Sequence, residues 1–209
     1  MFRTALLSIV LALAGYAAAA WLTHDFQVWT AEGARRLEVA LQPVRTPSVV
    51  VDGPGISPQA LSRFLADGQT VTLVDFVYTR CQSVCLAMGS SFQQMQRALR
   101  ERGGKVKLLS ISFDGSHDTP DVLEAYALKL GADPALWRFA RVQAPQGARH
   151  LLADFQVVVV PDGRGDFEHN AAFLVIDPQG RLVRIFDYAE QQLALDYAQH
   201  LAGAAAPSP

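Results

Sequence analysis

The sequence has few cysteines and little net charge. Of its 209 residues only two are cysteine, 18% are charged, and the formal net charge is −2. Because a nucleic-acid-binding surface needs clustered cations and a disordered chain is poor in apolar residues, this composition suggests neither. Half of the residues are apolar, which suffices for the core of one domain of ordinary length. The sequence therefore predicts a single folded domain, with no DNA or RNA partner.

An uncharged run near the N-terminus extends from Ala5 to Leu22. It is about as long as a bilayer crossing requires, roughly 18 to 20 residues. Ala18 and Ala20 also have the A-x-A spacing of a signal-peptide cleavage site, but the length of the run favours an uncleaved anchor. In either case the rest of the chain is exported, and Arg3 favours a cytoplasmic N-terminus. We therefore expect a membrane-anchored protein whose soluble domain lies on the periplasmic side of the inner membrane.

Strand and helix patterns alternate along the rest of the chain. Val71–Tyr78 is apolar, β-branched and aromatic, which predicts a central strand buried on both faces. Apolar residues then recur at three- and four-residue steps from Ser83 to about Arg100, as in a helix, and Lys105–Phe113 predicts a second strand. The other predicted elements are a helix over Ala31–Ala40, an edge strand over Ser48–Val51, a helix starting at Thr119-Pro120, a helix over Gly147–Asp154, a strand over Phe155–Val160, a hairpin of Ala171–Asp177 with Arg181–Asp187, and a helix from about Gln191 to Leu201.

This order predicts an α/β fold with a mixed central sheet flanked by helices. We divide the chain into an N-terminal membrane anchor or signal (residues 1–23), a linker (24–47), the folded domain (48–203) and a flexible tail (204–209).

The two cysteines, Cys81 and Cys85, follow the predicted central strand and open the next helix. Backbone N–H groups and the helix dipole favour an anion at that place, so a thiol there ionises more readily. The thiolate is both the nucleophile of disulfide exchange and the metal-binding form. The C-x-x-x-C spacing puts both cysteines on one helical face, where they can chelate a soft ion or form a disulfide.

Three interpretations of this cysteine pair compete. A structural disulfide closing so short a loop would stabilise the fold little. A structural zinc site usually has four ligands, and the sequence contains no second cysteine pair. Monovalent copper is the metal that soft thiolates select, and it accepts two or three ligands.

Three blocks of sequence resemble the Sco/SenC family of copper-binding proteins for cytochrome c oxidase assembly. They are VDFVYTRCQSVC, SFDGSHDTPDVLEAY and HNAAFLVIDPQGRL, and they occur in the family's order between Val71 and Asp187. The resemblance implies a thioredoxin-like fold that binds a copper ion through two cysteines and one distant histidine, here Cys81, Cys85 and His169. The sequence departs from the family pattern at Gln82, Ser83, Leu86 and Glu168.

The resemblance implies a metallochaperone that delivers copper to the copper-site subunit of cytochrome c oxidase or exchanges it with another copper chaperone. The alternative is an enzyme, a thiol-disulfide oxidoreductase that keeps the copper-site cysteines of the oxidase reduced. Asp75 supports this alternative, because its position ahead of Cys81 is similar to that of the buried aspartate of thioredoxin, which moves protons to and from the thiols. If Asp75 is buried, desolvation should raise its pKa.

Two further possibilities carry less weight. His117, in a predicted turn, is the rival of His169 as third ligand, and the residues alone leave the two nearly level. A peroxiredoxin-like peroxidase would place a threonine three residues ahead of its nucleophilic cysteine, whereas Thr79 stands two residues ahead of Cys81.

Overall fold

The computed structural model describes residues 2–26, 28–81, 84–161, 163 and 167–204. Its elements are α1 (Phe2–Leu22), α2 (Ala31–Leu41), β1 (Val44–Arg45), β2 (Val50–Gly53), β3 (Ile56–Ala60), α3 (Leu61–Leu65), β4 (Val71–Val77), α4 (Val84–Arg102), β5 (Val106–Ser112), α5 (Pro120–Lys129), β6 (Trp137–Val142), α6 (Pro145–Asp154), β7 (Val159–Pro161), β8 (Phe167–His169), β9 (Ala172–Ile176), β10 (Arg181–Asp187), the 3-10 turn η1 (Tyr188–Glu190) and α7 (Gln191–Ala204).

Eight strands form one mixed sheet in the order β1-β10-β9-β4-β5-β6-β2-β3. Strands β4, β5 and β6 are parallel, whereas β9 is antiparallel to β4 and β2 is antiparallel to β6. All seven residues of β4 are buried, as expected for a strand covered on both faces. The predicted α/β class and central strand are confirmed.

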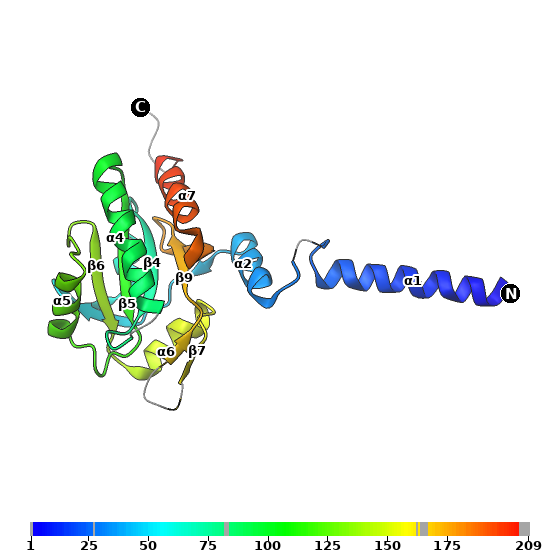
Figure 1. The fold of residues 1–209 in the computed structure, drawn as a ribbon, viewed down its shortest axis with the longest axis horizontal. Coiled ribbons are helices and arrows are strands. Elements are labelled where there is room, and N and C mark those ends of the chain that lie inside the picture. The colour runs from blue at the N-terminus through cyan, green and yellow to red at the C-terminus, as the bar shows by residue number, and fades with distance from the viewer. Residues whose placement is uncertain (1, 27, 82–83, 162, 164–166, 205–209) are drawn as a thin grey trace.

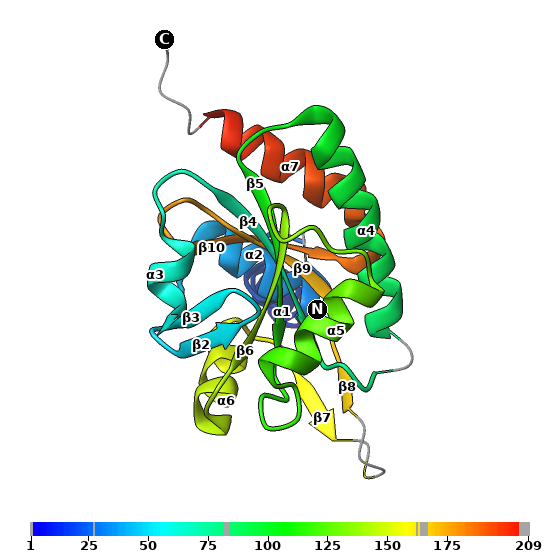
Figure 2. The ribbon, with the colours of Figure 1, turned by 90° about the vertical axis from the view of Figure 1, so that its left-hand side faces the viewer.

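Helices cover both faces of the sheet, as Figure 2 shows. Helices α4, α5 and α7 pack on one face, where Met88 and Phe92 of α4 join Leu73 of β4 in an apolar core. Helices α2, α3 and α6 pack on the other face, where Leu151 of α6 joins Phe76 of β4. The central strand thus contributes alternate residues to two separate cores.

Helix α1 extends away from the domain (Figure 1) and none of its residues is buried. With 21 residues and a mean hydropathy of 2.0, it is long and apolar enough to cross a membrane. Helix α2 and strand β1 follow in the segment expected to be a linker. Arg35 of α2 donates hydrogen bonds to the carbonyls of Phe155 and Gln156, and β1 pairs with β10. Much of this segment is therefore packed on the domain.

Two predicted strands differ from the structure. Phe155 caps helix α6 and is completely buried, and Gln156 adopts a left-handed conformation (φ 53°), so β7 begins only at Val159. The run of β-branched residues favours a strand locally. In the structure, however, Phe155 still belongs to the end of α6, where its ring packs in the core, so the strand starts later. The expected edge strand is also displaced, because β2 lies inside the sheet and β3 forms the edge.

Candidate metal centre

Cys81 lies in the loop between β4 and α4, at the carboxyl end of the central strand. Its backbone N–H donates to the carbonyl of Tyr78 at 3.2 Å, which turns the chain immediately after the strand. Cys81 is buried, at 4% exposure, in a cluster with Tyr78, and Phe113 and Phe167 pack against this cluster. The thiol therefore lies against an apolar, aromatic wall.

The three rings, which we call the aromatic cluster, come from segments that are far apart in the sequence. Tyr78 follows β4, Phe113 follows β5, and Phe167 begins β8. The ring centroids of Tyr78 lie 5.4 Å from Phe113 and 5.2 Å from Phe167, and those of Phe113 and Phe167 are 5.5 Å apart. These are ordinary distances for tilted and edge-on aromatic pairs. The cluster joins the β4–α4 loop, which carries Cys81 and which we call the cysteine loop, to β8, the strand that ends at His169.

The side chains of Cys85 and His169 lie outside the described residues, and only their backbone is placed. Cys85 is the second residue of α4. His169 is the last residue of β8 and pairs with Val159 of β7. Figure 2 shows β8 and the start of α4 at the same end of the sheet. The backbone thus brings the segments carrying Cys81, Cys85 and His169 to one end of the domain, and Cys81 is the member of this set whose side chain is described.

A buried carboxylate, Asp118, holds the cysteine loop from the other side. Its Oδ2 accepts hydrogen bonds from the Thr79 backbone N–H (3.0 Å) and the Ser112 hydroxyl (2.5 Å), and its Oδ1 accepts one from the Thr79 hydroxyl (2.6 Å). Asp118 has no exposed surface. Thr79, two residues ahead of Cys81, thus ties the loop to Asp118.

The neighbouring loop between β5 and α5 carries both an ion pair and the rival histidine. Asp114 accepts a hydrogen bond from the Arg80 guanidinium at 2.7 Å, so this loop is linked to the residue just before Cys81. His117 is exposed on the same loop, and its backbone N–H donates to the Asp114 carbonyl at 3.0 Å. His117 is therefore at the correct end of the sheet, but in a different loop from β8.

Asp75 is completely buried on β4, on the strand face that α4 covers. Neither carboxyl oxygen has a hydrogen-bond partner among the described residues. Burial raises the pKa of Asp75 to about 7. The Ser110 hydroxyl, beside it in register on β5, lowers the pKa again only in part, because desolvation of the carboxyl group is the larger effect. The same hydroxyl accepts a hydrogen bond from Trp137 Nε1 at 2.9 Å. A carboxyl group in this state can hold or release a proton near neutral pH.

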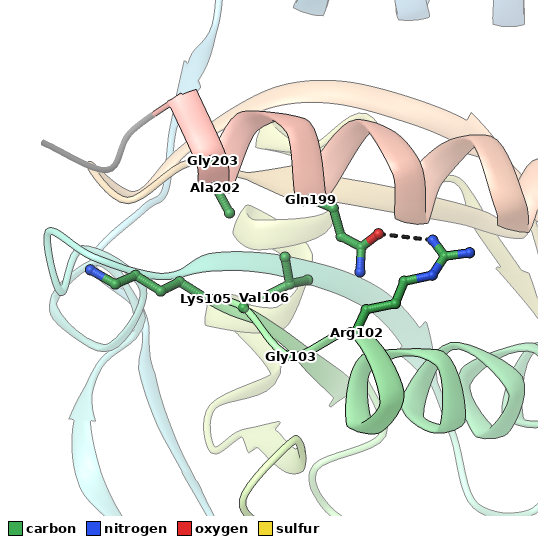
Figure 3. A pocket seen from close by; sticks show the side chains of 8 residues that line it. Arg102, Gly103, Lys105, Val106, Gln199, Ala202 and Gly203 are labelled. Atoms are coloured by element: carbon green, nitrogen blue, oxygen red, sulfur yellow. Dashed lines mark hydrogen bonds between the residues drawn. The ribbon is translucent and has the colours of Figure 1, made fainter. Parts of the chain in front are cut away.

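A cavity of about 420 Å³ lies at the opposite end of the domain, between the ends of α4 and α7 (Figure 3). Arg102, Lys105 and Gln199 line it, and Arg102 donates to the Gln199 side chain at 2.9 Å. The 19 residues of α4 separate this cavity from the cysteine loop by about 28 Å, at a rise of 1.5 Å per residue. The cavity therefore belongs to a different part of the surface from the candidate metal centre.

Sequence reasoning missed the supporting residues of the site. Asp118 stands within the SFDGSHDTP block, directly before the helix cap at Thr119, but only His117 of that block was considered as functional. A signal was available, because a polar residue after a buried parallel strand lies at the same sheet edge as residues after the neighbouring strand. The contacts of Tyr78 and Phe113 with Phe167 had no comparable local signal.

Comparison with known proteins places these features in a family. The SCO1/SenC family model matches residues 63–204, a span that includes every segment of the site. A SCO1 protein homolog from Bacillus subtilis is 25% identical over 141 residues, which covers 66% of this chain and 70% of that protein.

Solved structures show the same fold. A SCO1/SenC family lipoprotein from Bacillus anthracis str. Ames superposes with a TM-score of 0.68 at 23% identity, covering 77% of this chain and 98% of that one. The structure of Bradyrhizobium japonicum ScoI with copper bound superposes with a TM-score of 0.62 at 22% identity, covering 75% and 99%. The fold is thus the thioredoxin-like fold of Sco proteins. Since the family model spans most of the folded domain, the chain belongs to the SCO1/SenC family.

Proposed function

We propose that this protein is a copper chaperone for cytochrome c oxidase assembly, and that it holds its copper cargo through Cys81, Cys85 and His169. The observation that carries the proposal is that Phe167 packs against the cluster formed by Tyr78 and Cys81, because His169 follows Phe167 by two residues on β8. Alternate residues of a strand share one side and lie about 6.6 Å apart. Position 169 is therefore expected beside the cysteine loop.

The donor chemistry supports copper as the cargo. Two thiolates and one imidazole form a soft ligand set, and such a set favours monovalent copper over harder cations. The start of helix α4 stabilises negative charge near the cysteines. The aromatic cluster keeps water from one side of Cys81, which protects a bound soft ion from exchange with solvent ligands.

Transfer is proposed to occur by exchange of thiolate ligands with a copper-site subunit of cytochrome c oxidase or with another copper chaperone. Each cysteine of the recipient replaces one cysteine of this chain on the ion, so the ion's oxidation state does not change. Family membership and the copper bound to the Bradyrhizobium japonicum protein support this role. Helix α1 would tether the domain to the inner membrane, with the metal centre on the periplasmic side.

A metal assay of single variants tests the ligand set. The detergent-solubilised full chain is reduced, loaded with one equivalent of monovalent copper and desalted. We expect wild type to retain about one copper per chain, and Cys81→Ser, Cys85→Ser and His169→Ala to lose most of it, because the two ligands that remain hold the ion more weakly than three.

His117→Ala is the matched control, since it removes a histidine from the neighbouring loop and should leave copper retention unchanged. If His117→Ala loses copper while His169→Ala retains it, the third ligand is misassigned. If all variants retain copper equally, the chaperone proposal fails.

Asp75 favours a second candidate function, reduction of disulfides in the copper-site subunit. In this reaction one thiolate of the Cys81–Cys85 pair attacks the partner's disulfide, and the other thiol resolves the mixed disulfide. The pair ends oxidised and the partner ends with two thiols, so two electrons and two protons pass to the partner. A buried carboxyl group with a pKa of about 7 is suited to accept the resolving thiol's proton.

Exchange with a peptide disulfide distinguishes the two functions. A reductase should reduce a peptide that contains the recipient's two cysteines, and Asp75→Asn should slow that reaction without changing copper retention. A chaperone without reductase activity should load copper into the reduced peptide but leave its oxidised form unchanged.

A further inference from the structure

The hydroxyl of Tyr78 makes two hydrogen bonds to the backbone of one residue on β8. It donates to the Phe167 carbonyl at 3.2 Å and accepts from the Phe167 N–H at 3.3 Å. Tyr78 lies three residues before Cys81, and Phe167 lies two residues before His169. From this geometry we infer that the Tyr78 hydroxyl is a positioning group that latches the His169 strand to the cysteine loop.

Among the residues that the structure describes, the strand pairing of β8 is with β7 alone. These two strands form a separate two-stranded sheet of three register pairs, outside the eight-stranded sheet. At the base of this hairpin, the Asn170 N–H donates to the Val158 carbonyl at 3.2 Å, and the Val158 N–H donates to Asn170 Oδ1 at 2.8 Å. These bonds close the hairpin on itself but do not tie β8 to the β4–α4 loop. The aromatic cluster and the Tyr78 hydroxyl make that connection.

The hydroxyl adds directional control that ring packing does not have. Aromatic contacts tolerate small slides and tilts, whereas two hydrogen bonds to the N–H and C=O of one residue set where that residue lies along the loop. The ring of Tyr78 is buried, at 1% exposure, so the hydroxyl is held in place by its own packing. The Tyr78 ring is thus packed in the core, and its hydroxyl bonds to a short strand at the periphery of the domain.

The functional consequence rests on the proposed role of His169 as a ligand. A ligand held near the cysteines before copper arrives costs less free energy to order when the ion binds. The latch should therefore raise copper affinity through His169 alone, and it should have no effect on binding by the two cysteines.

Tyr78→Phe is the appropriate variant, because it keeps the ring and removes both hydrogen bonds. The first measurement needs no copper. In the full chain, labelled with ¹⁵N-phenylalanine in detergent micelles, hydrogen exchange of the Phe167 amide should accelerate by roughly fivefold or more, the factor that corresponds to one average hydrogen bond. Tyr197→Phe, on α7 against Phe186, is the matched control and should leave this exchange rate unchanged.

The second measurement is a double-mutant cycle on copper affinity. Tyr78→Phe should raise the Kd of the reduced chain for monovalent copper by roughly fivefold, and should change it by less than about twofold when His169 is already alanine. An equal effect of Tyr78→Phe in both backgrounds would mean that the hydroxyl does not act through His169.

Unchanged exchange of the Phe167 amide in Tyr78→Phe would overturn the latch itself. If His169→Ala alone leaves the Kd unchanged, the ligand assignment under the proposed function fails, and the exchange measurement still decides whether the latch exists. Different results would therefore overturn the latch and the assignment of His169 as a ligand.

Discussion

Asp75 and Asp118 are both buried near the same end of the sheet, yet their surroundings give them opposite tasks. Three hydrogen bonds from Thr79 and Ser112 satisfy the Asp118 carboxylate. Asp75 has no such partners among the described residues, so burial raises its pKa to about 7. Asp118 is therefore suited to hold structure, and Asp75 is suited to exchange a proton.

The raised pKa of Asp75 predicts how stability depends on pH. Between about pH 4 and pH 7 the folded protein keeps the Asp75 proton while the unfolded chain has lost it, so the free energy of unfolding falls as pH rises. At about 1.4 kcal/mol per pKa unit, ionisation of Asp75 costs about 4 kcal/mol above pH 7. Asp75→Asn should remove this pH dependence, which denaturant unfolding at pH 4 and pH 8 measures.

The informative quantity is the difference between wild type and variant, because other groups titrate equally in both. We expect the two proteins to be similar in stability at pH 4 and the variant to be the more stable at pH 8. A difference that does not change between these pH values would show that Asp75 is not held protonated by burial.

At the scale of single residues, the sequence predicts the chemically active residues better than the residues that hold them in place. Cys81 was identified from its place after a predicted strand and before a predicted helix, and Asp75 from the similarity of its position to that of the buried aspartate of thioredoxin. In the sequence Tyr78 is indistinguishable from an ordinary strand residue, because the residue that its hydroxyl contacts is 89 positions away. Contacts of that sequence separation leave no periodic signal.

Among the secondary-structure elements, those with clear periodicity were predicted closely. Strand β4, helix α4 and the β9–β10 hairpin appear where apolar runs and turn residues place them. Strand β6 was missed, although four of its six residues are buried, because Arg138 and Arg141 interrupt the apolar run. Strand β8, which carries His169, is only three residues long, and pairing with β7 rather than local propensity forms it.

The loops after β4 and β5 act as one unit, because Asp118 joins them. Asp118→Asn replaces one of the two acceptor oxygens by an NH2 group, which cannot accept a hydrogen bond from Thr79 or Ser112. We expect this variant to lower the free energy of unfolding by at least about 2 kcal/mol, since buried donors lose a charged acceptor. We also expect Cys81 to react faster with an alkylating reagent, because its loop is released.

Asp121→Asn is the control for this prediction. It changes an exposed aspartate three residues further on, in the first turn of α5, and should cost no more than about 1 kcal/mol. Equal effects of the two variants on stability and on Cys81 reactivity would contradict the role given to Asp118.

In the molecule as a whole, the apolar helix α1 and the candidate metal centre lie in separate parts (Figure 1). Helix α1 extends from the domain (Figure 1), and α2 packs on the sheet face opposite α4. The cysteine loop lies at the carboxyl end of β4. Under the proposed function, this arrangement lets the cysteine loop face a membrane-bound partner while α1 tethers the domain to the bilayer.

The central claim is that one copper ion binds to Cys81, Cys85 and His169 together. Copper X-ray absorption of the reduced full chain, loaded with one equivalent of monovalent copper, tests it most directly. We predict two sulfur ligands and one nitrogen ligand in wild type and in His117→Ala, and loss of the nitrogen ligand in His169→Ala. Spectra of His169→Ala that retain the nitrogen ligand, or wild type without sulfur ligands, would contradict the claim.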